Sequence, residues 1–509
     1  MIPRLNEITG YFYNPPVRHM LTICFVSGSI ATLALPPIYV FPSIFFLSIS
    51  IFYFFKTTKS IESFLIGFIS GFGWFLFSFY WIVFSLFVAG SSFFWMIPFV
   101  LFGLPMFLSI FWGLAFLLSF LLSESKTGKL LLLIIFWNFF EWIRGNIMTG
   151  LPWNMPGSSI SFSMETAQTV SFIGPYGQNL VMILLITSPI LWVIKEKIIT
   201  IVFLILTSIL FLMGSYRFHS TEIIETQMVA RLVQPSFSHK EKWNKNLFSE
   251  NLNLLINLST KNNKQKNLII WPETAITVFP EYIAEEIPII ASQALGKFKS
   301  TLITGIPIKS IEDNNETKYF NSMLMFNSKG EVKGAYNKIR LVPFGEYIPL
   351  RKFLPFASSL ASKSDFSPGS LKNTFSINGF GIIQPMICFE AIFPGFLNGF
   401  GKANLLVNIT NDFWFGNTLG PEQHLALARQ RSVESGIPLL RVSNSGISAG
   451  YDPLGQELGR IEFGETNYLD ITIPEKLSST FYNKWGDKIF FTMIFLLIIV
   501  FILKLLKSR

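Results

Sequence analysis

The stretch GIIQPMICFE (residues 381–390) decides how this sequence is interpreted, because a short apolar run leads directly into Cys388 and Glu390. A short apolar run of this kind predicts a buried strand. Cys388 is one of only two cysteines in the chain, and the other, Cys24, lies within an apolar run near the N-terminus. A structural disulfide between them is therefore not expected. An unpaired cysteine is either a small buried hydrophobe or a nucleophile.

The same apolar pattern recurs in the segment around Cys388 and predicts an α/β domain. The other runs read as strands are MVARLVQPS (228–236), NLIIWPE (267–273), TLITGIPI (301–308), NLLVNITND (404–412) and PLLRVSN (438–444). Two stretches between them have helical spacing, FSENLNLLINLSTKN (248–262) and EQHLALARQRSVES (422–435). The segment is long enough to bury a core of its own.

The remainder of the chain is too apolar for a wholly soluble protein. Hydrophobic residues make up 50% of the sequence, charged residues only 14%, and Phe occurs 56 times. A helix that spans a bilayer needs about 20 mostly apolar residues. The runs of this kind predict eight spans, at residues 20–35, 38–55, 61–88, 93–122, 130–142, 173–194, 198–213 and 489–506. No cleavable signal peptide is expected, because the first apolar run leads at once into another.

Basic residues predict the orientation of these spans, since Lys and Arg accumulate in cytoplasmic loops. They precede the first span and follow the second, fourth, sixth and eighth: Arg4, Arg18, Lys56, Lys59, Lys126, Lys129, Lys195, Lys197, Lys504, Lys507 and Arg509. Both termini are therefore expected in the cytoplasm and residues 215–488 on the opposite side. The net charge of +9 is therefore explained by the basic residues that orient the chain in the membrane, and it does not indicate nucleic-acid binding. The predicted organisation is a seven-helix membrane part (1–214), an exported domain (215–488) and a last span (489–509).

A nucleophilic thiol needs a base or a positive charge beside it, because an unperturbed thiol titrates near 8.5. Histidine is the usual base, and the exported domain contains His219, His239 and His424. Their surroundings, a membrane edge, a polar stretch and an apparent helix, favour solvated or structural roles. A carboxylate is therefore the expected base.

Two stretches supply charged candidates. In NLIIWPETAI (267–276), Glu273 follows an apolar strand, where α/β sheets build their sites; the alternative is a Glu in the first turn of a helix. In YNKIRLVPFGEYIP (336–349), Lys338 and Glu346 bracket a turn that contains Pro and Gly. The alternative for Lys338 is a solvated surface lysine.

Together, WPET, YNKIRLVPFGEYIP and ICFE resemble the Glu-Lys-Cys signatures of the nitrilase, or carbon–nitrogen hydrolase, superfamily. The eight spans, EWIRGNIMTGLPW (141–153) and NDFWFGNTLGPEQHLALARQR (411–431) further resemble the bacterial apolipoprotein N-acyltransferase family over nearly the whole chain. The resemblance implies a nitrilase-like αββα sandwich inserted between the last two spans of a multi-pass α-helical membrane domain. It also implies a multi-pass protein of the bacterial inner membrane with its catalytic domain in the periplasm.

The resemblance implies a role for each of these residues. Glu273 is expected to act as general base on Cys388, whose thiolate attacks a phospholipid ester to give a thioester. Lys338, with a backbone N–H near Cys388, would stabilise the oxyanion. Glu346 would orient the lysine. The acyl chain would then pass to the free α-amino group of a diacylglyceryl-modified N-terminal cysteine in a lipoprotein.

Three further residues match positions that the family uses near the substrate: Trp243, Phe389 and Glu390. Phe389 departs from the tyrosine that is common there, so its ring can line an acyl pocket but can supply no hydroxyl. Core packing of Trp243 and a salt bridge of Glu390 are the alternatives.

Two features suit a membrane surface. The connection at residues 347–370 is long enough to be a lid over an acyl chain, and the alternative is a disordered surface loop. Glu141 and Arg144 lie at the exported end of the fifth predicted span, where charges are costly and are usually paired or functional.

Two other functions remain open. A membrane-anchored amidase would use the same residues and hydrolyse its thioester with water. A transporter or sensor would need a polar path, but ionisable residues are scarce in the spans. The sequence contains no His/Cys cluster with the spacing of metal ligands and no phosphate-binding loop. It therefore indicates neither a metal nor an organic cofactor. The expected partners are a phospholipid donor and a diacylated apolipoprotein acceptor, and the chain is expected to be a monomer.

Overall fold

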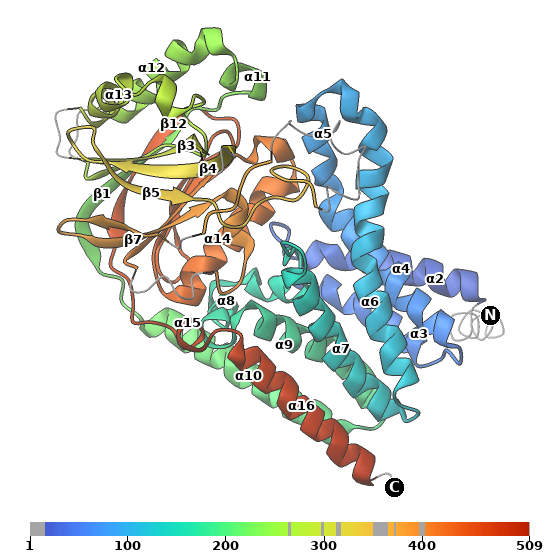
Figure 1. The fold of residues 1–509 in the computed structure, drawn as a ribbon. Helices are drawn as coiled ribbons and strands as arrows, with labels where there is room; N and C mark the ends of the chain where they lie inside the picture. The colour runs from blue at the N-terminus through green and yellow to red at the C-terminus, as the bar shows by residue number, and fades with distance from the viewer. Residues whose placement is uncertain are drawn as a thin grey trace, which may run out of the picture.

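The computed structural model describes residues 16–262, 266–296, 300–311, 317–349, 365–370, 373–396 and 403–507. Helices of the N-terminal half and the last helix form one part of the molecule, and a domain of two sheets forms the other (Figure 1). The chain leaves the helical part after α10 (Lys197–Ser220), builds the sheets and returns in α16 (Lys488–Lys507).

The helical part is that of a membrane protein. Six stretches within the described residues are long and apolar enough to cross a bilayer: Val17–Ala34, Ser60–Ala89, Phe99–Leu121, Val170–Val193, Lys197–Ser220 and Lys488–Leu506. They contain α2 (Val17–Ala31), α4 (Ser60–Phe79), α5 (Phe84–Ala89), α6 (Leu104–Leu121), α9 (Val170–Val193), α10 and α16.

The expectation of eight spans is not confirmed. The second expected span corresponds to a shorter apolar stretch, Phe41–Phe54, which contains α3 (Leu47–Phe54). The fifth corresponds to α7 (Lys126–Asn146), which has 21 residues but carries ionisable side chains near both ends. It is not one of the six.

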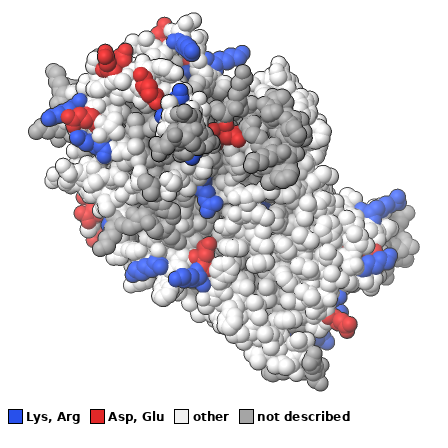
Figure 2. Space-filling model, viewed as in Figure 1, with Lys and Arg blue, Asp and Glu red and all other residues white. Residues whose placement is uncertain are grey.

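Two connections of the helical part and its last helix meet at one end of the bundle. Thr127 Oγ1 donates to Glu196 Oε1 at 2.7 Å, and Lys504 Nζ donates to Glu196 Oε2 at 2.7 Å. The start of α7, the connection between α9 and α10, and the C-terminal half of α16 are thereby tied together. Figure 2 shows basic side chains, with a few acidic ones among them, at the edge of the helical part remote from the sheets, and a broad uncharged surface between.

Twelve strands in the described residues form two mixed sheets. The first sheet has the order β12-β1-β2-β3-β4-β5, in which β1, β2 and β3 are parallel neighbours. The second has the order β11-β10-β9-β8-β7-β6, in which β7, β8 and β9 are parallel neighbours. The strands are β1 (Glu225–Gln234), β2 (Leu268–Ile270), β3 (Thr301–Ile311), β4 (Thr317–Phe326), β5 (Val332–Asn337), β6 (Phe375–Ile377), β7 (Gly381–Ile387), β8 (Leu405–Thr410), β9 (Leu439–Ser443), β10 (Ser448–Tyr451), β11 (Glu457–Ile461) and β12 (Asn467–Pro474).

Helices cover the outer faces of the sheets. Apolar residues of α12 (Phe248–Thr260) and α13 (Glu286–Leu295) share a core with β2 and β3. Helix α14 (Leu419–Ser435) packs on the second sheet, and a single larger core joins the inner faces of both sheets to the membrane helices. The six predicted strands, which are β1, β2, β3, β7, β8 and β9, and the predicted helices α12 and α14 are all confirmed.

Helix α14 connects the two parts of the molecule. Its first turn is capped by the Thr418 side chain, which accepts from Gly420 N, and it ends at Gly436 in the left-handed conformation. Gln423 near its start accepts a hydrogen bond from Trp81 Nε1 at 3.1 Å and another from Asn154 Nδ2 at 3.0 Å. Both donors belong to the membrane part, so the helix behind the second sheet is fixed to it.

Candidate active site

Cys388 lies where β7 ends, as the first residue of a short 3-10 helix, Cys388–Ile392. Its backbone has φ +50°, a left-handed conformation that costs energy for a non-glycine residue and clusters at functional sites. The side chain is half-buried. Burial, and then the negative charge of Glu273, raise the pKa of the Cys388 thiol to about 12. The thiol is therefore protonated at neutral pH and needs a base before it can react.

Glu273 follows β2 because the chain leaves the sheet at Trp271 and Pro272. Trp271 is buried and donates from Nε1 to Ser259 Oγ at 2.8 Å, which anchors the end of the strand on α12. Gly305 on the neighbouring strand β3 gives the Glu273 backbone room. A Cβ atom at residue 305 would lie 2.3 Å from Thr274 N and 2.7 Å from Glu273 Cα.

Lys338 and Glu346 come from the loop after β5 and meet Glu273 there. Lys338 Nζ donates to Glu346 Oε1 at 2.9 Å and lies 3.7 Å from Glu273 Oε1. Asn321 on β4 joins the two carboxylates, because its Nδ2 donates to Glu273 Oε1 at 2.7 Å and to Glu346 Oε1 at 2.8 Å. The four side chains form one hydrogen-bonded cluster.

The charge on Lys338 is held by this cluster. Burial alone would lower the pKa of Lys338, but Glu346 and then Glu273 outweigh it, so its pKa is raised well above the ordinary value for lysine. The side chain is a permanent ammonium group. Its positive charge also acts on the Cys388 thiol, where it partly offsets the rise in pKa that burial and Glu273 cause.

The loop that carries Lys338 and Glu346 is tied to the membrane part. Arg340 Nη1 donates to the Thr149 carbonyl oxygen at 3.1 Å, and the hydroxyl groups of Tyr347 and Thr149 are hydrogen-bonded to each other. Thr149 lies just after α7. The cluster therefore sits beside the membrane helices rather than at the outer end of the α/β domain.

The three residues predicted near the substrate have different surroundings. Trp243 is 49% exposed, so it is not a core residue. Phe389 is buried and packs edge-on against Phe393, with ring centroids 5.1 Å apart.

Glu390 is buried, and its carboxylate accepts from Tyr336 Oη at 2.8 Å and from the main-chain nitrogen atoms of residues 339, 340 and 387 at 2.6, 3.1 and 2.7 Å. It therefore joins the loop that bears Lys338 to the strand that leads to Cys388. Contact of Trp243, Phe389 and Glu390 with a substrate stays a prediction.

Sequence reasoning missed several residues at the site. Asn321 lies within a strand that was not predicted. Lys242, the last residue of α11 (His239–Lys242), is buried and donates from Nζ to the Glu273 carbonyl oxygen at 2.8 Å. Burial lowers the pKa of Lys242 to about 8, although Glu273 and Cys388 oppose the shift. The capping box formed by Ser238 and Glu241 is the signal that could have marked this turn as structured.

Glu141 and Arg144, expected to be either paired or functional, are paired with each other at the end of α7. Arg144 Nε donates to Glu141 Oε2 at 3.1 Å, and Trp112 Nε1 donates to Glu141 Oε1 at 2.6 Å, all three side chains being buried. Arg144 Nη1 also donates to the carbonyl oxygen of Trp153 at 3.1 Å. The pair thus fixes the segment that follows α7.

Most of the predicted lid lies outside the described residues, since only 347–349 and 365–370 of this connection are described. Across the part of the chain that the structure describes, no group of three His, Cys, Asp or Glu side chains could hold a metal ion.

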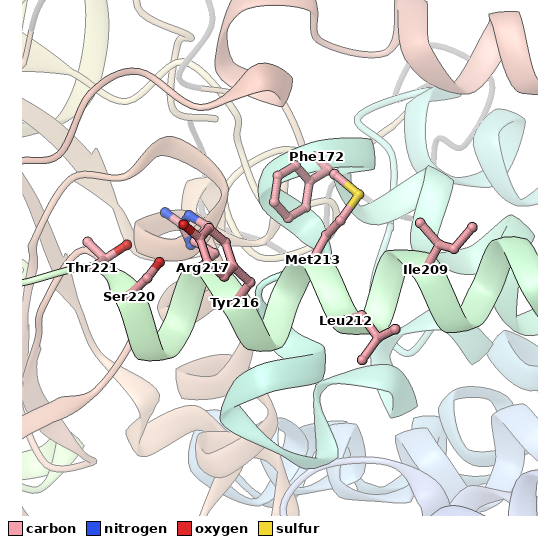
Figure 3. A pocket seen from close by; sticks show the side chains of 8 residues that line it. All are labelled: Phe172, Ile209, Leu212, Met213, Tyr216, Arg217, Ser220 and Thr221. Carbon is pink, nitrogen blue, oxygen red and sulfur yellow. The ribbon is translucent and has the colours of Figure 1, made fainter.

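A surface hollow of about 580 Å³ lies along α10, where Figure 3 shows Arg217, Ser220 and Thr221 at one end and Ile209 and Leu212 at the other. None of the predicted site residues lines this hollow.

Family models match both parts of the chain. Residues 230–481 match the carbon–nitrogen hydrolase family, which agrees with the two mixed sheets and defines this part of the chain as a nitrilase-like domain. Residues 27–188 match the N-terminal domain of apolipoprotein N-acyltransferases.

Curated relatives cover nearly the whole sequence. The chain is 36% identical to the apolipoprotein N-acyltransferase of Rickettsia bellii over 96% of its length and 98% of the relative. It is 35% identical to that of Rickettsia typhi, over 95% of its length and 98% of the relative. The chain belongs to the apolipoprotein N-acyltransferase family. Among solved structures, an amidase from Nesterenkonia sp. covers 54% of this chain and 99% of its own, with 20% identity and a TM-score of 0.36.

Proposed function

We propose that this protein transfers an acyl chain from a phospholipid to the N-terminal α-amino group of diacylglyceryl-cysteine apolipoproteins, through a thioester on Cys388. The observation that carries the proposal is the meeting of Lys338 with both Glu273 and Glu346, in a loop that Glu390 joins to the strand leading to the strained Cys388. The names of the relatives support the acceptor class.

In the first half-reaction, the Glu273 carboxylate takes the proton from Cys388 Sγ. The thiolate sulfur attacks the ester carbonyl carbon, and negative charge develops on the carbonyl oxygen. Lys338 and a backbone N–H near Cys388 stabilise this oxyanion; loss of one such donor typically costs on the order of 3 kcal/mol of transition-state stabilisation. The C–O bond then breaks, and the lysophospholipid alcohol leaves with the proton held by Glu273.

In the second half-reaction, the free amine of the apolipoprotein attacks the thioester carbonyl carbon. A proton passes from the amine to Glu273, the C–S bond breaks, and the product is an amide. Sulfur leaves as the thiolate and recovers its proton from Glu273, so the enzyme returns to its initial state. Glu346 takes no part in proton transfer and holds Lys338 in place.

The location and partners are part of the same proposal. The exported domain (215–488) would lie in the periplasm above the inner membrane, with the helical part (1–214) and the last span (489–509) in the bilayer. The shared contact of Thr127, Lys504 and Glu196 supports a common cytoplasmic end for two basic connections and the end of the last span. The protein would act as a monomer on a phospholipid donor and a diacylated apolipoprotein acceptor.

The test uses the full-length protein in detergent with an acyl-labelled phospholipid. We expect label on Cys388 that hydroxylamine removes, and no label on the C388A control. A diacylated lipopeptide added afterwards should discharge the label as amide. Release of free fatty acid alone would instead identify a membrane-anchored amidase, and the absence of any covalent label would leave a transporter or sensor.

A further inference from the structure

A second group of buried polar side chains contacts Cys388 through its main chain. His424 on α14 has its Nε2 atom 3.3 Å from the Cys388 carbonyl oxygen. Its Nδ1 atom lies 2.9 Å from Asp412 Oδ1 and 2.9 Å from Arg441 Nη2. Arg441 Nη2 in turn donates to Asp412 Oδ2 at 2.5 Å. His424, Asp412 and Arg441 are all completely buried, and none has a part in the acyl transfer described above.

The position of the proton on His424 follows from its partners. A carbonyl oxygen can only accept a hydrogen bond, so Nε2 has to carry a proton. Nδ1 faces both a donor, Arg441, and an acceptor, Asp412. If Nδ1 accepts from Arg441 the imidazole is neutral, and if it donates to Asp412 the ring is an imidazolium. In either state Nε2 donates to Cys388.

This bond is made to a residue whose backbone needs support. A non-glycine residue with φ +50° persists only where the surrounding structure holds it. Asn408 Nδ2 lies 3.5 Å from the same carbonyl oxygen, which is a long hydrogen bond, and it is nearer to the Met386 carbonyl oxygen, at 3.2 Å. His424 is therefore the main side-chain donor that fixes the orientation of the Cys388 peptide group.

The imidazole is itself held from the membrane part. Trp153 lies against it, with ring centroids 5.1 Å apart and planes inclined by 35°. The Trp153 main chain is in turn fixed by Arg144, the partner of Glu141. Next to His424, Gln423 accepts from Trp81 and Asn154. A continuous set of contacts thus runs from the end of α7 to the nucleophile.

We propose that His424 is a positioning residue for the nucleophile: its Nε2–H group holds the Cys388 carbonyl and so keeps the left-handed backbone from which the thiol meets Lys338 and Glu273. Trp153 keeps the imidazole in place from the membrane side. This inference rests on the proposed function, because it explains how the thiol of an acyl-transfer enzyme is aimed.

The test compares two substitutions of His424 that differ in which ring nitrogen they imitate. In H424Q the amide nitrogen reaches the position of Nε2 and can still donate to Cys388. In H424N it reaches only the position of Nδ1. Full-length wild type and variants are incubated with acyl-labelled phospholipid, and the rate of thioester formation is measured against phospholipid concentration.

We expect H424N to form the thioester on the order of 100-fold more slowly than wild type, since a small misplacement of a reacting group costs about that much. H424Q should retain most of the wild-type rate. The phospholipid concentration for half-maximal rate should not change in either variant, because buried His424 does not contact the substrate. Equal rates for H424N and H424Q, whether both high or both low, would overturn the proposal.

Two further measurements keep the inference separate from other failures. If wild type forms no thioester, the proposed function fails, and the rate of Cys388 alkylation by iodoacetamide in the same variants then tests the positioning role. If the variants do not fold, 15N NMR of histidine-labelled wild type tests the inference by showing whether Nε2 of His424 carries a proton. Nε2 of His424 is expected to be protonated, and a deprotonated Nε2 would contradict the inference.

Discussion

Lys338 and Glu346 form the shorter of the two ion pairs of the buried lysine, with 2.9 Å between Nζ and Oε1. Glu273, the expected base, lies farther from the same ammonium group, at 3.7 Å. The two distances fit the division of tasks that we propose, in which Glu346 holds the lysine and Glu273 takes the thiol proton.

Replacing Glu346 should weaken the site in two steps. E346Q keeps an oxygen for Lys338 but loses the charge, so we expect acylation to slow about 10- to 100-fold, as for residues that orient a catalytic group. E346A leaves the buried ammonium without its nearest partner, which should also destabilise the fold by about 3–5 kcal/mol. Thioester formation and thermal unfolding of both variants check this. Wild-type rates in both would show that Glu346 is dispensable.

Asn321 can be tested by adding a charge. N321D places a third carboxylate beside Glu273 and Glu346, and like charges raise the pKa of a carboxyl group. The base is active when ionised, so the acylation rate should fall most at low pH and recover as the pH rises. The acid limb of the pH–rate profile should thus move to higher pH. N257D, on the exposed face of α12, is the control that should leave the profile unchanged. An unmoved acid limb in N321D would argue against the cluster.

Gly305 should tolerate no side chain. In G305A the new Cβ would press on Thr274 N and Glu273 Cα, at 2.3 and 2.7 Å, so the main chain has to shift. We expect acylation to fall on the order of 100-fold from misplacement of Glu273. G103A is the matched control, because no atom lies within 4 Å of a Cβ there and its φ of −67° is helical. The two variants should differ in rate while both still fold.

Lys242 predicts a pH dependence of stability. Its pKa falls from 10.5 to about 8 on burial, so between these values the unfolded chain binds more protons than the folded one. Stability then rises with pH from about 8 to 10.5, and the cost of burying the ammonium is fully present below 8. K242M should flatten this rise. Thermal unfolding across the same pH range measures it, and an identical slope in wild type and variant would refute the assignment.

The strands that could be predicted share one property. All six belong to the parallel centres of the two sheets; in β8 every residue is buried, and four of its six residues are Leu, Val or Ile. The six that were missed are the outer, antiparallel strands. β5 and β11, for example, expose several side chains and show no clear apolar run.

The site shows the same division. Glu273 and Cys388 follow predicted strands directly, so their position at the sheet edge could be anticipated. Asn321 lies inside a strand that was not predicted, and nothing in the sequence distinguishes its amide from those of surface asparagines. The role of His424 depends on a main-chain carbonyl 36 positions away, for which a side-chain pattern carries no signal.

Thr149 connects the loop that carries Lys338 and Glu346 directly to the membrane part of the molecule. Through Arg340 and Tyr347, the segment after α7 holds the turn that carries the Lys338 ammonium group. A movement of this segment would reach that turn through two hydrogen bonds. A water-soluble fragment that lacked the membrane part would lose both hydrogen bonds of Thr149. Engineering of such enzymes for new acyl donors therefore has to keep the two parts together.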